Sequence, residues 1–459
     1  MSYYIKSLES PIDKKNIWAD DILERKSVAD KFTNLIRSIQ GSCVISINSP
    51  YGSGKSFFLN RWYRSLDNDF VSLYFNAWNT DFYEHALIPF VSSLIQQMRE
   101  NSILGKDDSL LNKLENVGGK IGASIALNLV SKATLDLIKP DELKESLESL
   151  QNYENTKYFD NYKERLRNLN EFKNILSELI HELKQKNQKL VIFVDELERC
   201  RPTFAVELLE TIKHVFEVSG IIFVLALDRS QLEHTVKNLY GSGINADGYL
   251  RRFIDIEMRL PKPQIIPYVK SLYDFHKLNE IVKFDNSYYS GGETLVTYMT
   301  IWSNVFRLSL REIEQCFAQL NIVIRTMLQG YSFLPVLLSF LVCVKCREPQ
   351  FYTKIGTDTV EKELQEIDKL FAPFEFEADS KRIIKIFYCV SIDTYEEEYI
   401  TKRFNEINFA LGDSGAKLSN DDYAFFAEAM EIRKTLIYDR GFDHHQKIIL
   451  TLKKYLELT

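Results

Sequence analysis

Cysteine is scarce in this sequence, and the first residues lack the pattern of a secretion signal. The 459 residues include six cysteines, too few for the disulfide framework of a secreted protein of this length. The opening segment, MSYYIKSLESPIDKK, has no apolar stretch like that of a signal peptide. The pair Cys343 and Cys346 lacks a second such pair or nearby histidines. We therefore expect reduced, mostly buried thiols in a cytoplasmic protein.

Positive charge is not in excess either. The formal net charge is −7 and the isoelectric point is near 5.7, which argues against non-specific nucleic-acid binding as the main activity. A local nucleic-acid groove is possible but not indicated. With 45% hydrophobic and 26% charged residues, the chain can bury a large core in two or three domains.

Long, purely apolar runs are also missing. Residues 327–344 are uncharged and long enough to cross a bilayer, but they contain Gly330 and Pro335. We interpret this segment as a buried helix of a helical domain. Residues 117–138 are interrupted by charged side chains such as Lys132. No membrane span is predicted from either segment.

What the sequence does contain is a candidate phosphate-binding loop, in the segment VISINSPYGSGKSFFL from Val44 to Leu59. Nucleotide phosphates require converging backbone N–H groups, a lysine that reaches the terminal oxygens, and a hydroxyl for Mg²⁺. An apolar run precedes the glycines and an apolar helical face follows, so the loop joins a strand to a helix. The predicted nucleotide-binding residues are Pro50, Tyr51, Gly52, Ser53, Gly54, Lys55, Ser56 and Phe57.

One position departs from the usual pattern of this loop. Ser49 stands where the first glycine is expected. That outermost position mainly permits a tight turn, and Pro50 restricts Ser49 to extended geometry. We therefore keep the phosphate-loop interpretation, with Lys55 as a catalytic side chain and Ser56 as a Mg²⁺ ligand.

Five apolar runs predict the strands of one sheet. Because most of them are continuous rather than alternating, they indicate a parallel sheet covered by helices on both faces. The predicted fold is an α/β P-loop NTPase core with a five-stranded, mainly parallel sheet, a large helical insertion and a helical C-terminal region. The expected strands are Cys43–Ile47, Val71–Phe75, Leu190–Val194, Ile221–Leu227 and Phe253–Met258.

These elements suggest four segments. The core comprises residues 1–78 and 189–263, the insertion residues 79–188, and the helical lid and C-terminal domain residues 264–459. Within the insertion, apolar residues recur at helical three-four spacing. They are Leu169, Phe172, Ile175, Leu176, Leu179, Ile180 and Leu183.

Two acidic residues end the third expected strand, in the segment LVIFVDELERC. Asp195 is placed to hold Mg²⁺ through water. Glu196 is placed to orient and deprotonate the water that attacks the γ-phosphate. Together with the phosphate loop upstream, these residues have the pattern of a Walker B motif with its catalytic glutamate.

Several further residues are candidates for the site. Asp228, after the fourth strand, suits either a sensor of the γ-phosphate or a helix N-cap, and the sequence leaves both open. Arg251 and Arg252 precede the fifth strand, where a neighbouring subunit could present a cation to the γ-phosphate; ordinary surface charge is the alternative. Ser309 is the expected cap of a later helix, and Arg311 follows it in the first turn. The dipole at that end of a helix disfavours a cation. Arg311 is therefore a candidate for pairing with an anion such as phosphate.

These motifs together resemble the KAP family of P-loop ATPases, relatives of the AAA+ and STAND enzymes. The resemblance covers roughly residues 20–263. It rests on the segments DILERKSVADKFTNLI, SPYGSGKSFFL, LYFNAWNTD, VIFVDELERCRP, FVLALDRSQLEHTV and GYLRRFIDIEMRLPKP, in that order.

The resemblance implies an extra strand between the two nucleotide motifs and the use of ATP and Mg²⁺. In some members the insertion carries paired membrane helices, but here it lacks two clean spans. Many bacterial relatives look like components of anti-phage defence operons, which is an association and not a mechanism.

Two classes of function follow. One is an ATPase that assembles into a homo-oligomer and switches or drives an effector protein encoded nearby. The other is an ATP-dependent scaffold or sensor with little turnover. The intact set Lys55, Ser56, Asp195 and Glu196 favours the first class. A membrane-associated ATPase is a third alternative.

Overall fold

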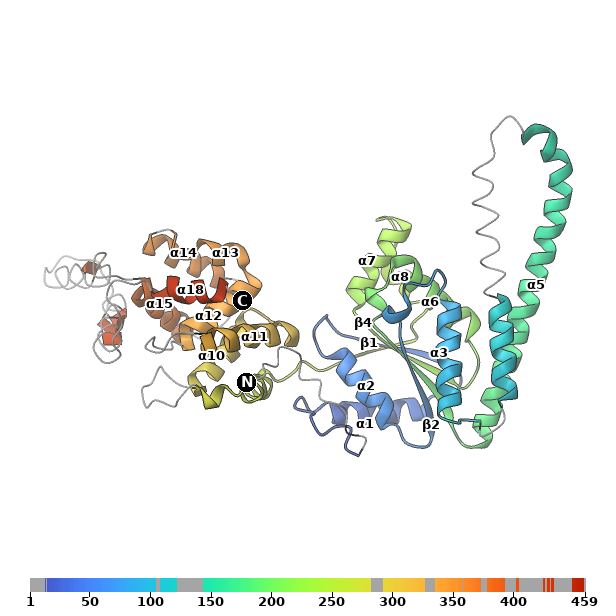
Figure 1. The fold of residues 1–459 in the computed structure, drawn as a ribbon, viewed down its shortest axis with the longest axis horizontal. Helices are drawn as coiled ribbons and strands as arrows, with labels where there is room; N and C mark the ends of the chain where they lie inside the picture. The colour runs from blue at the N-terminus through green and yellow to red at the C-terminus, as the bar shows by residue number, and fades with distance from the viewer. Residues whose placement is uncertain are drawn as a thin grey trace. The chain divides into compact units, whose positions relative to one another are not determined.

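A computed structural model gives the fold of the chain (Figure 1). It divides into two compact units, one that ends at Lys262 and one that continues from Pro263, and each is described by itself. The structure describes residues 13, 15–104, 108–121, 143–281, 292–326, 335–357, 359–372, 378–392, 402–403, 424–425, 427–429, 431–432 and 448–457.

A five-stranded sheet lies at the centre of the first unit. Its strands are β1 (Cys43–Asn48), β2 (Phe70–Asn76), β3 (Lys189–Asp195), β4 (Ile221–Leu227) and β5 (Ile256–Arg259). Their order is β2-β3-β4-β1-β5, and every pairing is parallel. The predicted fold class is therefore confirmed, with β4 as the extra strand between β1 and β3.

Helices cover both faces of this sheet because alternate strand residues point to opposite sides. On one face, Ile45, Val224 and Phe193 belong to a core with Phe58 and Trp62 of α2 (Lys55–Ser65). That core also includes residues of α1 (Arg25–Ser38). The result is a three-layer α/β/α unit.

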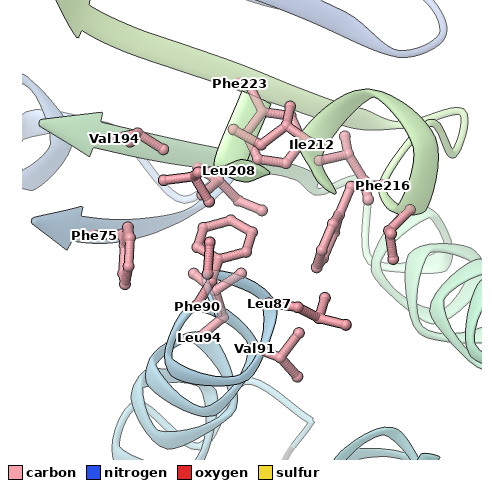
Figure 2. Packing of buried hydrophobic residues seen from close by; sticks show 14 of the residues in the cluster. Phe75, Leu87, Phe90, Val91, Leu94, Val194, Leu208, Ile212, Phe216 and Phe223 are labelled. Atoms are coloured by element: carbon pink, nitrogen blue, oxygen red, sulfur yellow. The ribbon is translucent and has the colours of Figure 1, made fainter. Parts of the chain in front are cut away.

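On the other face, α3 (Leu87–Glu100), α5 (Leu143–Gln185) and α6 (Pro202–Val215) pack on the sheet. Figure 2 shows Phe90 of α3 between Phe75 of β2 and Phe216, which follows α6. All seven residues predicted for the helical face in the insertion lie on α5; six are buried in this core and Leu169 packs against it. That part of the prediction is confirmed.

The start of the fifth strand was predicted wrongly. The expected strand began at Phe253, whereas β5 begins at Ile256. The N–H groups of Phe253 and Ile254 both donate to the carbonyl of Leu250, so the chain is still turning out of α8 (Ala246–Leu250). Phe253 and Ile254 are both buried in the hydrophobic core beside the helices. Such burial requires apolar side chains, and consecutive apolar residues look like a buried strand in the sequence.

The second unit is helical among its described residues. Trp302 of α10 lies at its centre, with ring centroids 5.5 Å from Phe340 and 5.8 Å from Phe371. Its helices are α9 (Ile265–Phe275), α10 (Gly292–Val305), α11 (Leu310–Thr326), α12 (Pro335–Arg347), α13 (Pro349–Lys354), α14 (Val360–Phe371), α15 (Ala378–Ile392) and α18 (Ile448–Glu457).

Helix α12 contains the described part of the uncharged segment 327–344. Its residues from Pro335 to Val344 are all buried within the helical unit, which confirms the interpretation as a buried helix for this part. Residues 327–334, and 122–138 of the second tested segment, lie outside the described residues. None of the helices that the structure describes is long and apolar enough to cross a membrane.

Two glycines with positive φ, one before β1 and one before β4, yield a stability prediction. Gly220 and Gly41 have φ values of +108° and +100°, and the N–H of Gly220 donates to the carbonyl of Gly41. A Cβ at Gly220 would lie 2.6 Å from Cγ2 of the buried Ile180, whereas a Cβ at Gly41 meets nothing within 4 Å.

Both alanine variants should therefore lose about 1–2 kcal/mol to the unfavourable φ. Gly220→Ala should lose a further 1–3 kcal/mol, roughly, from overpacking. Urea unfolding followed by circular dichroism measures the two free energies. Equal destabilisation by Gly220→Ala and Gly41→Ala would show that a Cβ at Gly220 does not crowd Ile180.

Candidate active site

The glycine-containing loop lies between β1 and α2, at the carboxyl edge of the sheet. Gly52 and Gly54 have φ values of +75° and +85°, a region in which a side chain would be strained. The N–H of Ser49 donates to the carbonyl of Leu227 at the end of β4. The loop is thus fixed to the neighbouring strand, and the serine in place of the first glycine is accommodated.

Lys55, the first residue of α2, is directed back into this loop. Its Nζ donates to the carbonyl oxygens of Ser49, at 2.7 Å, and Pro50, at 3.3 Å. It also lies 3.3 Å from Oε1 of Glu198. The side chains of Lys55 and Glu198 are 7% and 6% exposed, so this ion pair is buried.

Two polar atoms beside the loop are buried without a hydrogen-bond partner among the described residues. They are Oγ of Ser53 and Oε2 of Glu198. Burial raises the pKa of Glu198, and the neighbouring ammonium of Lys55 opposes this shift. Buried polar atoms are normally paired. The Ser53 hydroxyl can donate to an oxygen of a ligand, so it indicates a place where a polar ligand would complete the site.

Asp195, the last residue of β3, is 1% exposed. Its Oδ2 accepts a hydrogen bond of 2.7 Å from the hydroxyl of Tyr74 on β2. Burial raises the pKa of Asp195, while hydrogen bonds from Tyr74 and Ser56 lower it. The hydroxyl of Ser56 and the carboxylate of Asp195, both predicted as metal ligands, are therefore brought together.

Glu196 is held by two partners at the same edge of the sheet. Nδ2 of Asn76, the last residue of β2, donates to its Oε2 at 3.2 Å, and Arg199 lies 3.0 Å from its Oε1. Glu196 has a φ of +60° and precedes the short 3-10 turn η2 (Leu197–Arg199). This left-handed conformation separates the two glutamates, so that Glu196 contacts Asn76 while Glu198 contacts Lys55.

Arg199 connects this turn to exposed aromatic residues. Its guanidinium lies over the rings of Tyr51 and Trp78, at 5.0 Å and 5.4 Å from their centroids. Tyr51 directly precedes Gly52 of the loop, and both aromatic residues are about half exposed, at 47% and 50%. Cation–π contacts of this kind favour one orientation of the guanidinium.

Asp228 follows β4 and has the N-cap geometry of α7 (Arg229–Tyr240). Its Oδ1 accepts hydrogen bonds from the N–H groups of Ser230 and Gln231. Its Oδ2 accepts from the N–H of Tyr51, at 3.2 Å. The N-cap alternative therefore describes its contacts, and the same carboxylate also holds the phosphate loop; a role toward the γ-phosphate stays a prediction.

Arg251 and Arg252 lie at the end of α8 and are exposed. Nε of Arg251 is 2.8 Å from Oδ2 of Asp247, although the arginine side chain is 74% exposed. Asp247 also pairs with Arg229 of α7. The position of α8 is thus fixed by ion pairs, while both arginines stay accessible to a neighbouring molecule.

Arg311 belongs to the second unit, in the first turn of α11, and it is exposed. Ser309 and Glu312 form a reciprocal capping box there: the N–H of Ser309 donates to Oε2 of Glu312, and the N–H of Glu312 to Oγ of Ser309. The predicted cap is confirmed, and the pairing of Arg311 with phosphate stays a prediction.

The sequence interpretation missed four residues of the site: Tyr74, Asn76, Glu198 and Arg199. Tyr74 and Asn76 lie at the carboxyl end of β2, where the principle used for Asp195 applies equally, because parallel strands end at one edge. That signal was available in the segment LYFNAWNTD. No pattern could have shown which of the two glutamates faces Lys55.

The donor set agrees with a magnesium nucleotide. Mg²⁺ prefers oxygen ligands and is usually held by one or two protein groups together with phosphate oxygens and water. Ser56 and Asp195 supply two such oxygens beside the buried Lys55. Within the described ranges, no group of three or more His, Cys, Asp or Glu residues forms a separate metal centre.

Comparison with known proteins places these features in a family. The model of the KAP family P-loop domain matches residues 25–327. An uncharacterized protein of Methanocaldococcus jannaschii is 24% identical over an alignment of 176 residues, and the match covers 33% of this chain and 88% of that protein.

Two solved structures also align with the chain. The ORC2 protein of Aeropyrum pernix, in ADPNP and ADP complexes, is 12% identical with a TM-score of 0.34, covering 95% of this chain and 93% of that one. A Walker-type ATPase of Pyrococcus abyssi is 11% identical with a TM-score of 0.29, covering 98% and 100%. At such low scores neither likeness indicates a function.

The Tyr74–Asp195 hydrogen bond yields a second prediction. Tyr74→Phe removes the donor to a buried carboxylate and should lower the free energy of unfolding by about 1.5–3 kcal/mol near neutral pH. Tyr63→Phe is the matched control, since its ring stacks on Tyr74 and its hydroxyl has no hydrogen bond among the described residues.

The loss should depend on pH. Removing the donor raises the folded-state pKa of Asp195 further above its unfolded value. The protonated form is favoured in the folded state at low pH, and this advantage is lost as the pH rises through the folded pKa. The deficit of Tyr74→Phe should therefore shrink on acidification, as measured by urea unfolding without nucleotide. A pH-independent deficit, or one equal to that of Tyr63→Phe, would contradict this account.

Proposed function

Because this chain belongs to the KAP family of P-loop domains, we propose that it is a Mg²⁺-dependent ATPase that works as an oligomeric switch or motor on a partner effector. The observation that carries the proposal is the convergence of Lys55, Ser56 and Asp195 at one edge of a parallel sheet. Parallel α/β sheets commonly bind ligands at the carboxyl ends of their strands.

Each side chain has a role that its position supports. The loop from Pro50 to Phe57 would bind the phosphates through backbone N–H groups, with Lys55 on the β and γ oxygens. Ser56 and Asp195 would hold Mg²⁺, which neutralises charge on the β- and γ-phosphates when bound. Glu196, kept beside the site by Asn76 and Arg199, would accept the proton of the attacking water.

Assembly is the second part of the proposal. The exposure of Arg251 and Arg252 supports a role in a neighbouring subunit, where they would stabilise charge on the transferring phosphoryl group. An effector encoded nearby would respond to the assembled state. A role in antiviral defence rests on the resemblance of the motifs to bacterial relatives in anti-phage operons.

An ATP-dependent scaffold or sensor with little turnover is the alternative. The contacts of Glu196 with Asn76 and Arg199 favour it in one respect, because both of its carboxylate oxygens are already engaged. Each carboxylate oxygen keeps a further lone pair for a water, so these contacts restrict where the attacking water can bind. Turnover measurements separate the two functions.

Two substitutions test the ATPase directly. Lys55→Ala should weaken ATP binding roughly tenfold to a hundredfold, because it removes a charged donor to the phosphates. Glu196→Gln should preserve binding and slow hydrolysis by about two to four orders of magnitude, since the base is lost and the positioning stays. Binding is measured by calorimetry and turnover by phosphate release. Normal turnover in Glu196→Gln would place the base elsewhere.

Mixed assemblies test whether the arginines act between subunits. Lys55→Ala subunits keep the arginines, and Arg251→Ala/Arg252→Ala subunits keep the phosphate loop. Each alone should be nearly inactive, whereas their mixture should regain part of the ATPase activity. An arginine supplied in trans is worth a rate factor of roughly a thousand or more.

The control for this experiment is co-assembly, shown by sedimentation of the mixture with ATP. No recovery in subunits that do assemble would remove the shared-site model. Full specific activity of a monomer at high dilution would have the same consequence.

A further inference from the structure

The contacts of Lys55 leave little capacity for a phosphate. An ammonium group has three donors, and Nζ of Lys55 has three oxygen partners within 3.3 Å, from Ser49, Pro50 and Glu198. Its side chain is 7% exposed. A phosphate oxygen that binds this lysine must therefore replace or share one of these partners.

Glu198 is the partner that is easiest to exchange. The two carbonyl oxygens belong to the backbone of the phosphate loop itself, whereas Glu198 comes from the separate turn η2. Its carboxylate is also the charged partner, and it would repel a phosphate brought close to Lys55 in a buried place. Its second oxygen has no hydrogen-bond partner among the described residues, so less is lost when the side chain moves.

We propose that Glu198 competes with the phosphates of the nucleotide for Lys55 and so sets the affinity of the loop. This inference rests on the proposed function and deepens it. Glu198 is a positioning residue, because it acts through the lysine, while Glu196 serves the attacking water. Binding of ATP exchanges one anion on Lys55 for another.

The exchange has a consequence for the neighbouring turn. Glu198 and Arg199 are adjacent in η2, and Arg199 contacts Glu196, Tyr51 and Trp78. Movement of Glu198 away from Lys55 therefore disturbs the residue that holds Glu196. The same turn links occupancy of the phosphate loop to two half-exposed aromatic side chains on the surface.

The test measures the affinity of the full-length protein for Mg²⁺ and AMP-PNP by calorimetry. Glu198→Gln keeps the shape of the side chain and removes its charge, and it should bind about tenfold more tightly than the wild type. Glu207→Gln is the matched control. It removes the same charge from α6, where Glu207 pairs with His85 instead of Lys55, and should change the affinity less than about twofold.

A double-mutant cycle assigns the effect to the pair. On a Lys55→Ala background, Glu198→Gln should no longer tighten binding, because the competition has been removed. Circular dichroism checks that each variant folds. If Glu198→Gln does not fold, Glu198→Asp draws the carboxylate back by one methylene and should shift the affinity in the same direction by a smaller factor.

The outcomes are distinguishable. Unchanged or weaker binding by Glu198→Gln, or equal tightening by Glu198→Gln and Glu207→Gln, would overturn the competition. Tightening that persists without Lys55 would overturn it as well. Unchanged binding by Lys55→Ala alone would instead refute the proposed phosphate loop itself, whatever the result for Glu198.

Discussion

The burial of one ammonium group constrains the arrangement of the site. Lys55 is almost fully removed from solvent, and an isolated charge in such a place is strongly unfavourable, so anionic or carbonyl oxygens must surround it. Loop carbonyls and Glu198 supply these oxygens. The loop between β1 and α2 and the turn after β3 are therefore tied together by electrostatics as well as by the sheet.

The parallel sheet makes this meeting possible. All five strands run in the same direction, so the residues after β1, β2, β3 and β4 gather at one edge. Strand β4 lies between β1 and β3. Asp228 follows β4 and accepts a hydrogen bond from the N–H of Tyr51 in the phosphate loop. Strand β2 supports the acidic residues of β3 from the outside, with Tyr74 on Asp195 and Asn76 on Glu196.

Much of this could be predicted from the sequence, and the failures have identifiable causes. Continuous apolar runs located four strands to within one residue at each end, because buried parallel strands demand such runs. The predicted start of the fifth strand was wrong because Phe253 and Ile254 are buried beside the helices and do not belong to the strand. Tyr74 and Asn76 were overlooked because a tyrosine or asparagine at a strand end is less conspicuous than a carboxylate.

By itself, the sequence determined the phosphate loop, the acidic end of β3, the helical face of α5 and the order of the elements. These depend on local patterns: glycine spacing, apolar runs and helical periodicity. Only the tertiary structure decided which glutamate meets Lys55. The left-handed conformation of Glu196 and the tight turn after it direct Glu196 and Glu198 to different neighbours. The direction of a side chain in such a turn depends on the packing around it and not on the order of residues along the chain.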